Sequence, residues 1–173
     1  SIIPAYEKFE ITFQIQDSIA HNFQFPYDPS PPQGIDINKP MYQGITVNAI
    51  FTQDNWETTY QQPAFYFQHF EEDIRENREW YYPTDKFSWK VRFSPPNPGD
   101  WQYKIYTEDA SGYTESPVQS FRVSQSPNPG FIQVSSDDPR YFEFSNGDFF
   151  SGLGYNLTNH QIDLANPMRS SQS

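Results

Sequence analysis

The sequence predicts an all-β fold, in the form of an immunoglobulin-like β-sandwich of about seven antiparallel strands followed by a short β-hairpin tail. Aromatic residues make up 18% of the 173 residues, and 16 prolines and 8 glycines interrupt the chain at short intervals. This composition favours short strands joined by loops. Several segments also alternate between apolar and polar residues, as a strand does when one of its faces lies on a core.

The alternating segments follow one another along the first 125 residues. Residues 9–15 form the first of them. A proline-rich stretch at residues 17–43 has little periodicity and is expected to be a long ordered loop. Residues 45–51 and 64–70 alternate again, and residues 118–123 complete the sandwich as its last strand.

The clearest hairpin in the sequence joins two alternating strands. Residues 87–93 and residues 101–106 both alternate, and Pro-Pro-Asn-Pro-Gly lies between them. Proline and glycine in such a segment favour a reversal of the chain direction. Trp89 and Trp101 occupy the inward phase of the two strands, so we expect both to anchor the core.

Residues 71–79 depart from the alternating pattern. The segment is dense in charge and has neither a period-two nor a period-3.6 apolar stripe. We therefore expect an exposed insertion there, with a helical turn as one form that it could take.

The net charge of −11 at pH 7 limits the classes of partner. Nucleic acids and anionic lipids require basic surfaces, so neither a nucleic acid nor a membrane is expected as a partner, and neutral or cationic partners are favoured. The chain contains no cysteine, which excludes disulfides and thiolate metal sites. No apolar run approaches the roughly 18 residues that span a bilayer. We expect the protein to be secreted or at the cell surface.

Motifs spread along the chain occur in a characteristic order. They are Tyr6-Glu-Lys-Phe-Glu-Ile, Asn22-Phe-Gln-Phe-Pro-Tyr-Asp, Trp89-Lys-Val-Arg-Phe-Ser-Pro, Pro98-Gly-Asp-Trp, Asn128-Pro-Gly-Phe-Ile, Pro139-Arg-Tyr-Phe and the apolar run at residues 149–156. In this order, over most of residues 6–156, they resemble the immunoglobulin-like domain of unknown function that precedes a (β/α)8 barrel in proteins assigned as glycoside hydrolases.

The resemblance implies a division of the chain. Residues 1–125 correspond to the immunoglobulin-like β-sandwich, and residues 126–173 to a linker, a hairpin and the truncated start of a second, barrel-like domain. Residues 149–156 correspond to the first barrel strand. The catalytic carboxylates of such a barrel would lie at the ends of later strands, which this sequence does not contain. We therefore expect no catalytic residues, no cofactor and no enzymatic activity of the chain by itself.

Four aromatic residues are the candidate carbohydrate-binding residues: Trp80, Tyr81, Tyr82 and Trp56. The apolar C–H faces of sugar rings stack on flat aromatic side chains, and neighbouring polar groups hydrogen-bond the hydroxyls. The alternative for the first three is structural: Trp80 then covers the edge of the core, and the tyrosines are ordinary strand-surface residues.

Clustered carboxylates raise two further possibilities. Asp137, Asp138 and Asp148 could gather around Ca²⁺, but their spacing matches no EF-hand, and such loops are common without a metal, so no metal site is predicted. A pair of carboxylates could also serve glycoside hydrolysis. Runs of charge usually mark solvated surfaces, however, and nothing in the sequence places two of them across a cleft.

Three functions remain open at this point. The first is a non-catalytic accessory module of an extracellular glycoside hydrolase, which docks a catalytic barrel in cis or assists binding to a polysaccharide. The second is an extracellular structural subunit that assembles with neighbouring copies through exposed β edges. The third is a fragment of a longer enzyme.

Overall fold

The computed structural model describes residues 2–152 and residue 154 of the chain. Its strands are β1 (Ile2–Pro4), β2 (Phe9–Phe13), β3 (Thr46–Thr52), β4 (Tyr60–Pro63), β5 (Phe65–Arg75), β6 (Arg78–Phe93), β7 (Gly99–Asp109), β8 (Gly112–Glu115), β9 (Gln119–Ser124), β10 (Ile132–Val134), β11 (Phe142–Phe144) and β12 (Phe149–Phe150). One 3-10 turn, η1, covers Pro40–Tyr42. No helix long and apolar enough to cross a bilayer occurs within the described residues.

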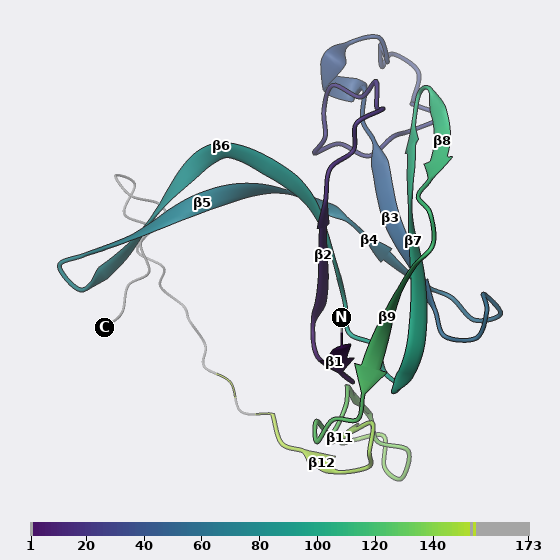
Figure 1. The fold of residues 1–173 in the computed structure, drawn as a ribbon, viewed down its shortest axis with the longest axis vertical. Coiled ribbons are helices and arrows are strands. Elements are labelled where there is room, and N and C mark those ends of the chain that lie inside the picture. Colours follow the sequence, from purple (N-terminus) through teal and green to yellow (C-terminus); the bar gives the residue numbers. More distant parts are fainter. Residues whose placement is uncertain (1, 153, 155–173) are drawn as a thin grey trace. The chain divides into compact units, whose positions relative to one another are not determined.

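Two sheets form the main body of the fold (Figure 1). The larger has the strand order β1-β9-β7-β3-β4, with β8 also paired to β7, and the smaller has the order β2-β6-β5. Most pairings are antiparallel, whereas β1 lies parallel to β9. The short strands β1, β4 and β8 were not evident from the alternation pattern, because three or four residues are too few to display it.

Aromatic residues from both sheets fill the space between them. Phe51 of the larger sheet stacks on Phe93 of the smaller sheet, with ring centroids 4.2 Å apart. Phe9 and Phe121 form a second stacked pair across the layers at 4.0 Å. Trp101 is fully buried, and its indole Nε1 donates a hydrogen bond to the Asn97 carbonyl oxygen at 2.9 Å. The predicted all-β sandwich is confirmed.

The inward placement of both core tryptophans is also confirmed. Trp101 belongs to the main cluster of buried residues, whereas Trp89 belongs to a second cluster with Ile45 and Val47. Tyr66 packs against Trp89 at a ring separation of 5.3 Å. Such contacts add specific aromatic geometry to the burial of apolar surface.

The expectation of a helical turn within residues 71–79 is wrong. This segment is exposed, as expected, but it forms the end of a β-hairpin in which β5 extends to Arg75 and β6 starts at Arg78. Glu76 and Asn77 make the turn with φ angles of 53° and 58°. Two consecutive positive φ angles match the twist of a two-residue hairpin. The turn contains no glycine, so its sequence does not resemble the usual hairpin signal.

The described structure forms two compact units. One consists of Ser1–Phe67 with Ser88–Phe131 and is called the sandwich unit here; the other contains Gln68–Phe87 and the region that starts at Ile132. The hairpin segment at residues 68–87 is called the arm. The sandwich unit holds every buried residue of both core clusters.

The three strands β10, β11 and β12 form a small antiparallel sheet. Phe142 of its central strand β11 pairs with Val134 on one side and Phe150 on the other. The predicted hairpin tail therefore exists, and β12 lies within the run assigned to a first barrel strand. Residues 153, 155 and 156 of that run lie outside the described residues.

Candidate functional site

On the arm, three of the candidate aromatic residues lie on two faces of one strand. Trp80 and Tyr82 share a face of β6, and Tyr81 points to the opposite face because side chains alternate along a strand. Arg75 of β5 joins the first face. Its guanidinium carbon lies 5.0 Å from the Trp80 ring centroid and 5.6 Å from that of Tyr82.

Arg75 ties this arm cluster together through several contacts. Its Nε lies 3.0 Å from the Asp73 carboxylate, and its terminal nitrogen donates a hydrogen bond to the Tyr82 hydroxyl. The cation covers one face of the Trp80 ring and of the Tyr82 ring, so a sugar could stack only on the remaining faces. Trp80 Nε1 is buried and has no hydrogen-bond partner within the described part of the chain.

The fourth candidate, Trp56, belongs to the sandwich unit and lies in the loop between β3 and β4. Thr52, at the end of β3, organises this loop: its hydroxyl accepts the Trp56 N–H at 3.0 Å and donates to the Thr58 carbonyl oxygen at 2.9 Å. Hydrogen bonds from Thr58 to the Asp54 carboxylate hold the pKa of Asp54 below its usual value. The loop therefore fixes the position of Trp56, which has a φ of 71°.

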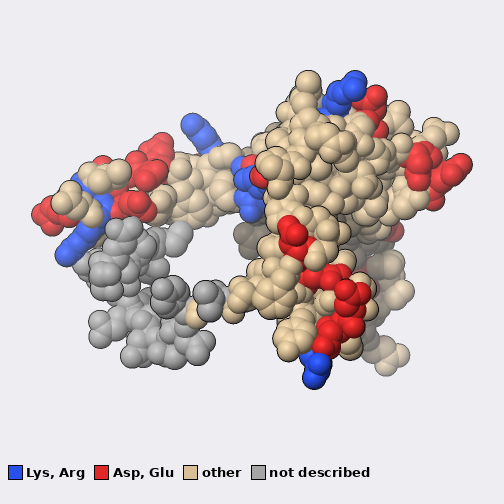
Figure 2. All heavy atoms as spheres, turned by 90° about the horizontal axis from the view of Figure 1, so that it is seen from below, with Lys and Arg blue, Asp and Glu red and all other residues tan. Residues whose placement is uncertain are grey.

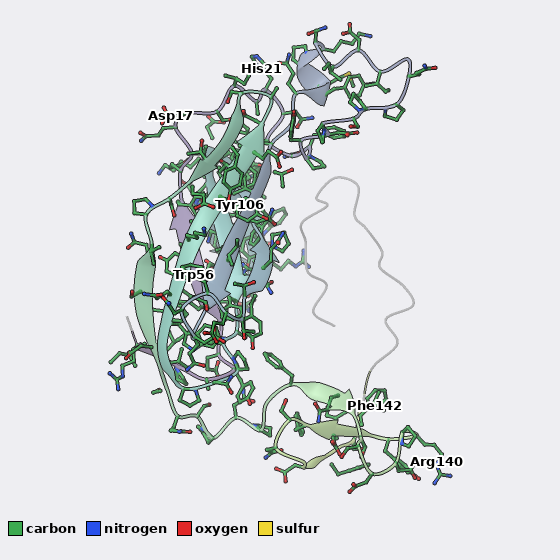
Figure 3. The ribbon with its side chains drawn as sticks, turned by 90° about the vertical axis from the view of Figure 1, so that its right-hand side faces the viewer. Asp17, His21, Trp56, Tyr106, Arg140 and Phe142 are labelled. Carbon is green, nitrogen blue, oxygen red and sulfur yellow. The ribbon has the colours of Figure 1, made fainter. Side chains whose placement is uncertain are left out.

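Trp56 lies over the outward face of the larger sheet. Lys104 of β7 places its Nζ 5.3 Å from the Trp56 ring centroid and donates a hydrogen bond to Glu115 of β8 at 2.8 Å. The Tyr113 hydroxyl also donates to Glu115, and the Tyr113 ring lies 5.5 Å from that of Tyr106. We call Trp56, Lys104, Tyr106, Tyr113 and Glu115 the sheet-face cluster; Figure 3 shows Trp56 and Tyr106 over the same sheet.

Electrostatics within the sheet-face cluster follow from its hydrogen bonds. The hydrogen bond to Glu115 raises the pKa of Tyr113 to about 12, because the phenol can donate it only while it keeps its proton; repulsion between a phenolate and the carboxylate adds to the effect. Lys104 and Tyr113 together lower the pKa of Glu115, since both donate to its charged form. The carboxylate therefore remains ionised, and the cluster presents a cation, an anion and aromatic rings side by side.

Sequence reasoning found Trp56 but not the residues that surround it. Lys104 and Tyr106 lie on the outward face of β7, opposite to Trp101. The alternation of the sequence could therefore have predicted that these two side chains share one face. Tyr113 and Glu115 lie on β8, a four-residue strand that was not predicted. The pairing of Tyr106 with Glu115 depends on the register of β7 and β8. Trp56 belongs to the sandwich unit, whereas Trp80, Tyr81 and Tyr82 belong to the other unit. Trp56 contacts Lys104, and Trp80 contacts Arg75.

Searches among known proteins found a distant structural likeness. No family model matches the sequence, and no curated protein matches it. The fold is similar to a crystal structure from Bacteroides vulgatus ATCC 8482 described as a "putative glycoside hydrolase", with 15% sequence identity and a TM-score of 0.49. The similarity covers 86% of this chain and 21% of that protein's chain, so this chain spans about a fifth of that protein's length.

Two of the three aspartates considered for a Ca²⁺ site, Asp138 and Asp148, have local side-chain contacts, whereas Asp137 contributes its backbone N–H to a hydrogen bond with the Ser135 hydroxyl. Asp138 pairs with Arg140 at 2.6 Å, and this guanidinium lowers the pKa of Asp138. Asp148 accepts a hydrogen bond from Asn146 at 2.7 Å. Within the described residues, no group of three or more histidine or acidic side chains is arranged to hold a metal ion. Acidic side chains lie in several separate groups over the face shown in Figure 2.

Proposed function

We propose that this chain is a non-catalytic accessory module of an extracellular glycoside hydrolase, with an immunoglobulin-like sandwich that assists carbohydrate binding and docks a catalytic barrel in cis. The observation that carries the proposal is the sheet-face cluster. It places three aromatic side chains on the outer face of a sandwich whose core is complete without them.

The chemistry of this cluster suits a neutral polysaccharide. Aromatic rings offer stacking surfaces for the C–H faces of sugars, and Glu115 and Lys104 offer an acceptor and donors for hydroxyl groups. Tyr113 is 55% exposed, so its ring is available to a ligand. The net charge of −11 disfavours acidic polysaccharides and is compatible with uncharged ones.

The arm supports the docking part of the proposal. A two-stranded ribbon is at best marginally stable in water without a further surface to pack on. On the face opposite to Trp80, Tyr81 is exposed, and Ile74 near the turn is 67% exposed. Apolar side chains on an arm of this kind fit a large partner, and the order of sequence motifs makes a barrel domain the preferred one.

Depletion from solution by insoluble polysaccharides tests the binding role. The chain is mixed with a panel of neutral polysaccharides, and the unbound fraction is measured for the parent and for Trp56→Ala, Tyr113→Ala and Trp80→Ala. Loss of Trp56 or Tyr113 is expected to weaken binding by about tenfold, as for other exposed aromatic anchors. Tyr141→Ala, an exposed tyrosine directly before β11, is the matched control.

The results separate the two clusters. If Trp80→Ala weakened polysaccharide binding and the other two substitutions did not, the carbohydrate site would lie on the arm. Binding that none of the three substitutions changes would reject the carbohydrate role, and release of reducing sugars by the purified chain would reject the non-catalytic assignment.

The small sheet favours a second candidate, a subunit that assembles with copies of itself. Ile132, Val134 and Phe142 lie on one face of this sheet and are each about half exposed. Sedimentation velocity over a range of protein concentrations tests this function. A larger assembly that Val134→Lys disperses, while Gln133→Lys on the other face does not, would support it; a monomer at all concentrations would reject it.

A further inference from the structure

A cavity of about 540 Å³ lies in the sandwich unit, beneath the long loop between β2 and β3. Its walls come from residues 19–44 and from Ala110 in the turn between β7 and β8, so all of them belong to one compact unit. His21, labelled in Figure 3, marks the loop that forms it. Neither cluster described above contributes to the lining, so the cavity is a separate candidate site.

The loop around the cavity is held in place at both ends. The backbone N–H groups of His21 and Asn22 both donate to the Gln43 carbonyl oxygen, at 2.9 and 3.0 Å, and the Ile45 N–H donates to the Phe25 carbonyl oxygen at 2.8 Å. Gly44 allows this close approach, because a Cβ there would lie 2.2 Å from the Phe25 oxygen. The cavity is therefore formed before any ligand arrives.

A carboxylate anchors the first part of the loop to the end of β7. Asp109 is buried and accepts hydrogen bonds from the Ser18 hydroxyl at 2.6 Å and the Ile19 N–H at 3.0 Å. Ser111 donates to the other oxygen of the same carboxylate. These contacts fix Ile19 and its neighbours as one wall of the cavity.

Aromatic and apolar side chains dominate the lining. The rings of Phe25 and Tyr42 lie 6.3 Å apart at an interplanar angle of 65°, as two adjacent walls of a box would. Phe25 remains 38% exposed and Ile37 50% exposed, although both line the cavity. The apolar surface in this hollow is therefore available to a ligand.

The charged groups in the lining indicate the sign of the charge that a ligand would carry. Asp28 supplies the carboxylate of the lining and His21 an imidazole, and no lysine or arginine is among the described residues that form it. One Asp28 oxygen accepts the Ser30 N–H at 2.8 Å. An anion would thus meet a carboxylate and electron-rich ring faces, whereas a cation would be attracted by both.

We propose that this loop cavity binds a small organic cation of the alkylammonium class. The ammonium group lies against the Phe25 and Tyr42 rings, with Asp28 as its counter-charge, and the apolar body fills the space lined by isoleucine and proline. This inference concerns a different site from the proposed carbohydrate face and stands or fails independently of it.

Choline and its uncharged carbon isostere, 3,3-dimethylbutan-1-ol, provide the test. Each is titrated into the ¹⁵N-labelled chain, and amide shifts are followed by NMR. Choline is expected to produce saturable shifts at residues 19–45 and to bind at least about fivefold more tightly than the isostere, as a desolvated cation over aromatic rings does. Equal affinities, or choline shifts confined to other residues or absent, would overturn the proposal.

Matched variants identify the groups responsible. Tyr42→Leu and Asp28→Asn are each expected to weaken choline binding by about fivefold or more, whereas Tyr42→Phe retains the ring and the affinity. Tyr113→Leu and Asp85→Asn remove an exposed tyrosine and a carboxylate outside the cavity and serve as controls. The indole resonance of Trp101 reports whether each variant is folded. Unchanged affinity in folded Tyr42→Leu and Asp28→Asn contradicts the assignment.

Discussion

Glu10 of β2 lies among three cations on the outer side of the smaller sheet. Its carboxylate accepts hydrogen bonds from Lys90 at 2.8 Å and Arg92 at 2.7 Å, and Lys8 lies 3.7 Å away. These contacts lower the pKa of Glu10 from 4.5 to about 2. Because Glu10 on β2 contacts residues of β6, the cluster links two neighbouring strands through their side chains as well as their backbones.

The lowered pKa predicts how stability depends on pH. A carboxyl group with a lower pKa in the folded state contributes stability above its unfolded pKa, and this contribution disappears as pH falls through the folded value. Replacing Glu10 by Gln should therefore reduce the free energy of unfolding by about 1–2 kcal/mol near neutral pH, after allowance for solvent screening, and by much less near pH 2. Urea unfolding at both pH values measures the difference.

Glu57→Gln is the control for this measurement, because Glu57 has no described side-chain partner. It should alter the free energy of unfolding by no more than about 0.5 kcal/mol at either pH. A Glu10→Gln penalty that stays constant between neutral and acidic pH would contradict the assignment.

At the scale of the element, the arm depends on a two-residue turn in which one residue, Glu76, is poorly suited to its backbone conformation. Glu76 and Asn77 both have positive φ, a conformation that asparagine and glycine adopt more readily than glutamate. Changing the pair to Asn-Gly should stabilise the arm by about 0.5–1 kcal/mol. Amide hydrogen exchange within residues 68–87 is then expected to slow by about two- to fivefold.

Glu72→Asn introduces asparagine at a strand position of the arm and provides the comparison. It should give no slowing, since asparagine offers no benefit where φ is not positive. Equal slowing in both variants would show that the turn conformation is not the cause.

Features that depend on a local sequence pattern could be predicted, whereas features that depend on contacts between distant segments could not. The strands with Trp89 and Trp101 were predictable because alternation over seven or so residues specifies a buried face by itself. The position of Arg75 over Trp80 and the meeting of Lys104 with Trp56 were not, because cross-strand register and loop conformation determine them. The candidate site was therefore predictable as a set of aromatic residues, but not as two separate clusters.

On the scale of the whole molecule, the core lies within the sandwich unit. The buried residues of both clusters fall between Ala5 and Val123. A chain that ends at residue 131 should therefore fold cooperatively, with a free energy of unfolding within about 1 kcal/mol of the parent value. Urea unfolding followed by far-ultraviolet circular dichroism measures this.

Trp101→Ala in the shortened chain is the destabilised reference. Loss of a buried tryptophan typically costs about 3–5 kcal/mol, so this variant should be largely unfolded or close to it. If the shortened chain itself lost cooperative unfolding, the core would need residues beyond 131.

The parallel pairing of β1 with β9 brings the two ends of the sandwich together. Pro4 is the register partner of Ser124, so the polypeptide enters and leaves this unit at neighbouring points. A unit with adjacent ends can be spliced into a surface loop of a host protein without stretching that loop. The same geometry allows a short peptide to join the two ends of the sandwich while new termini are placed in a surface loop. The sandwich is therefore a natural candidate for circular permutation.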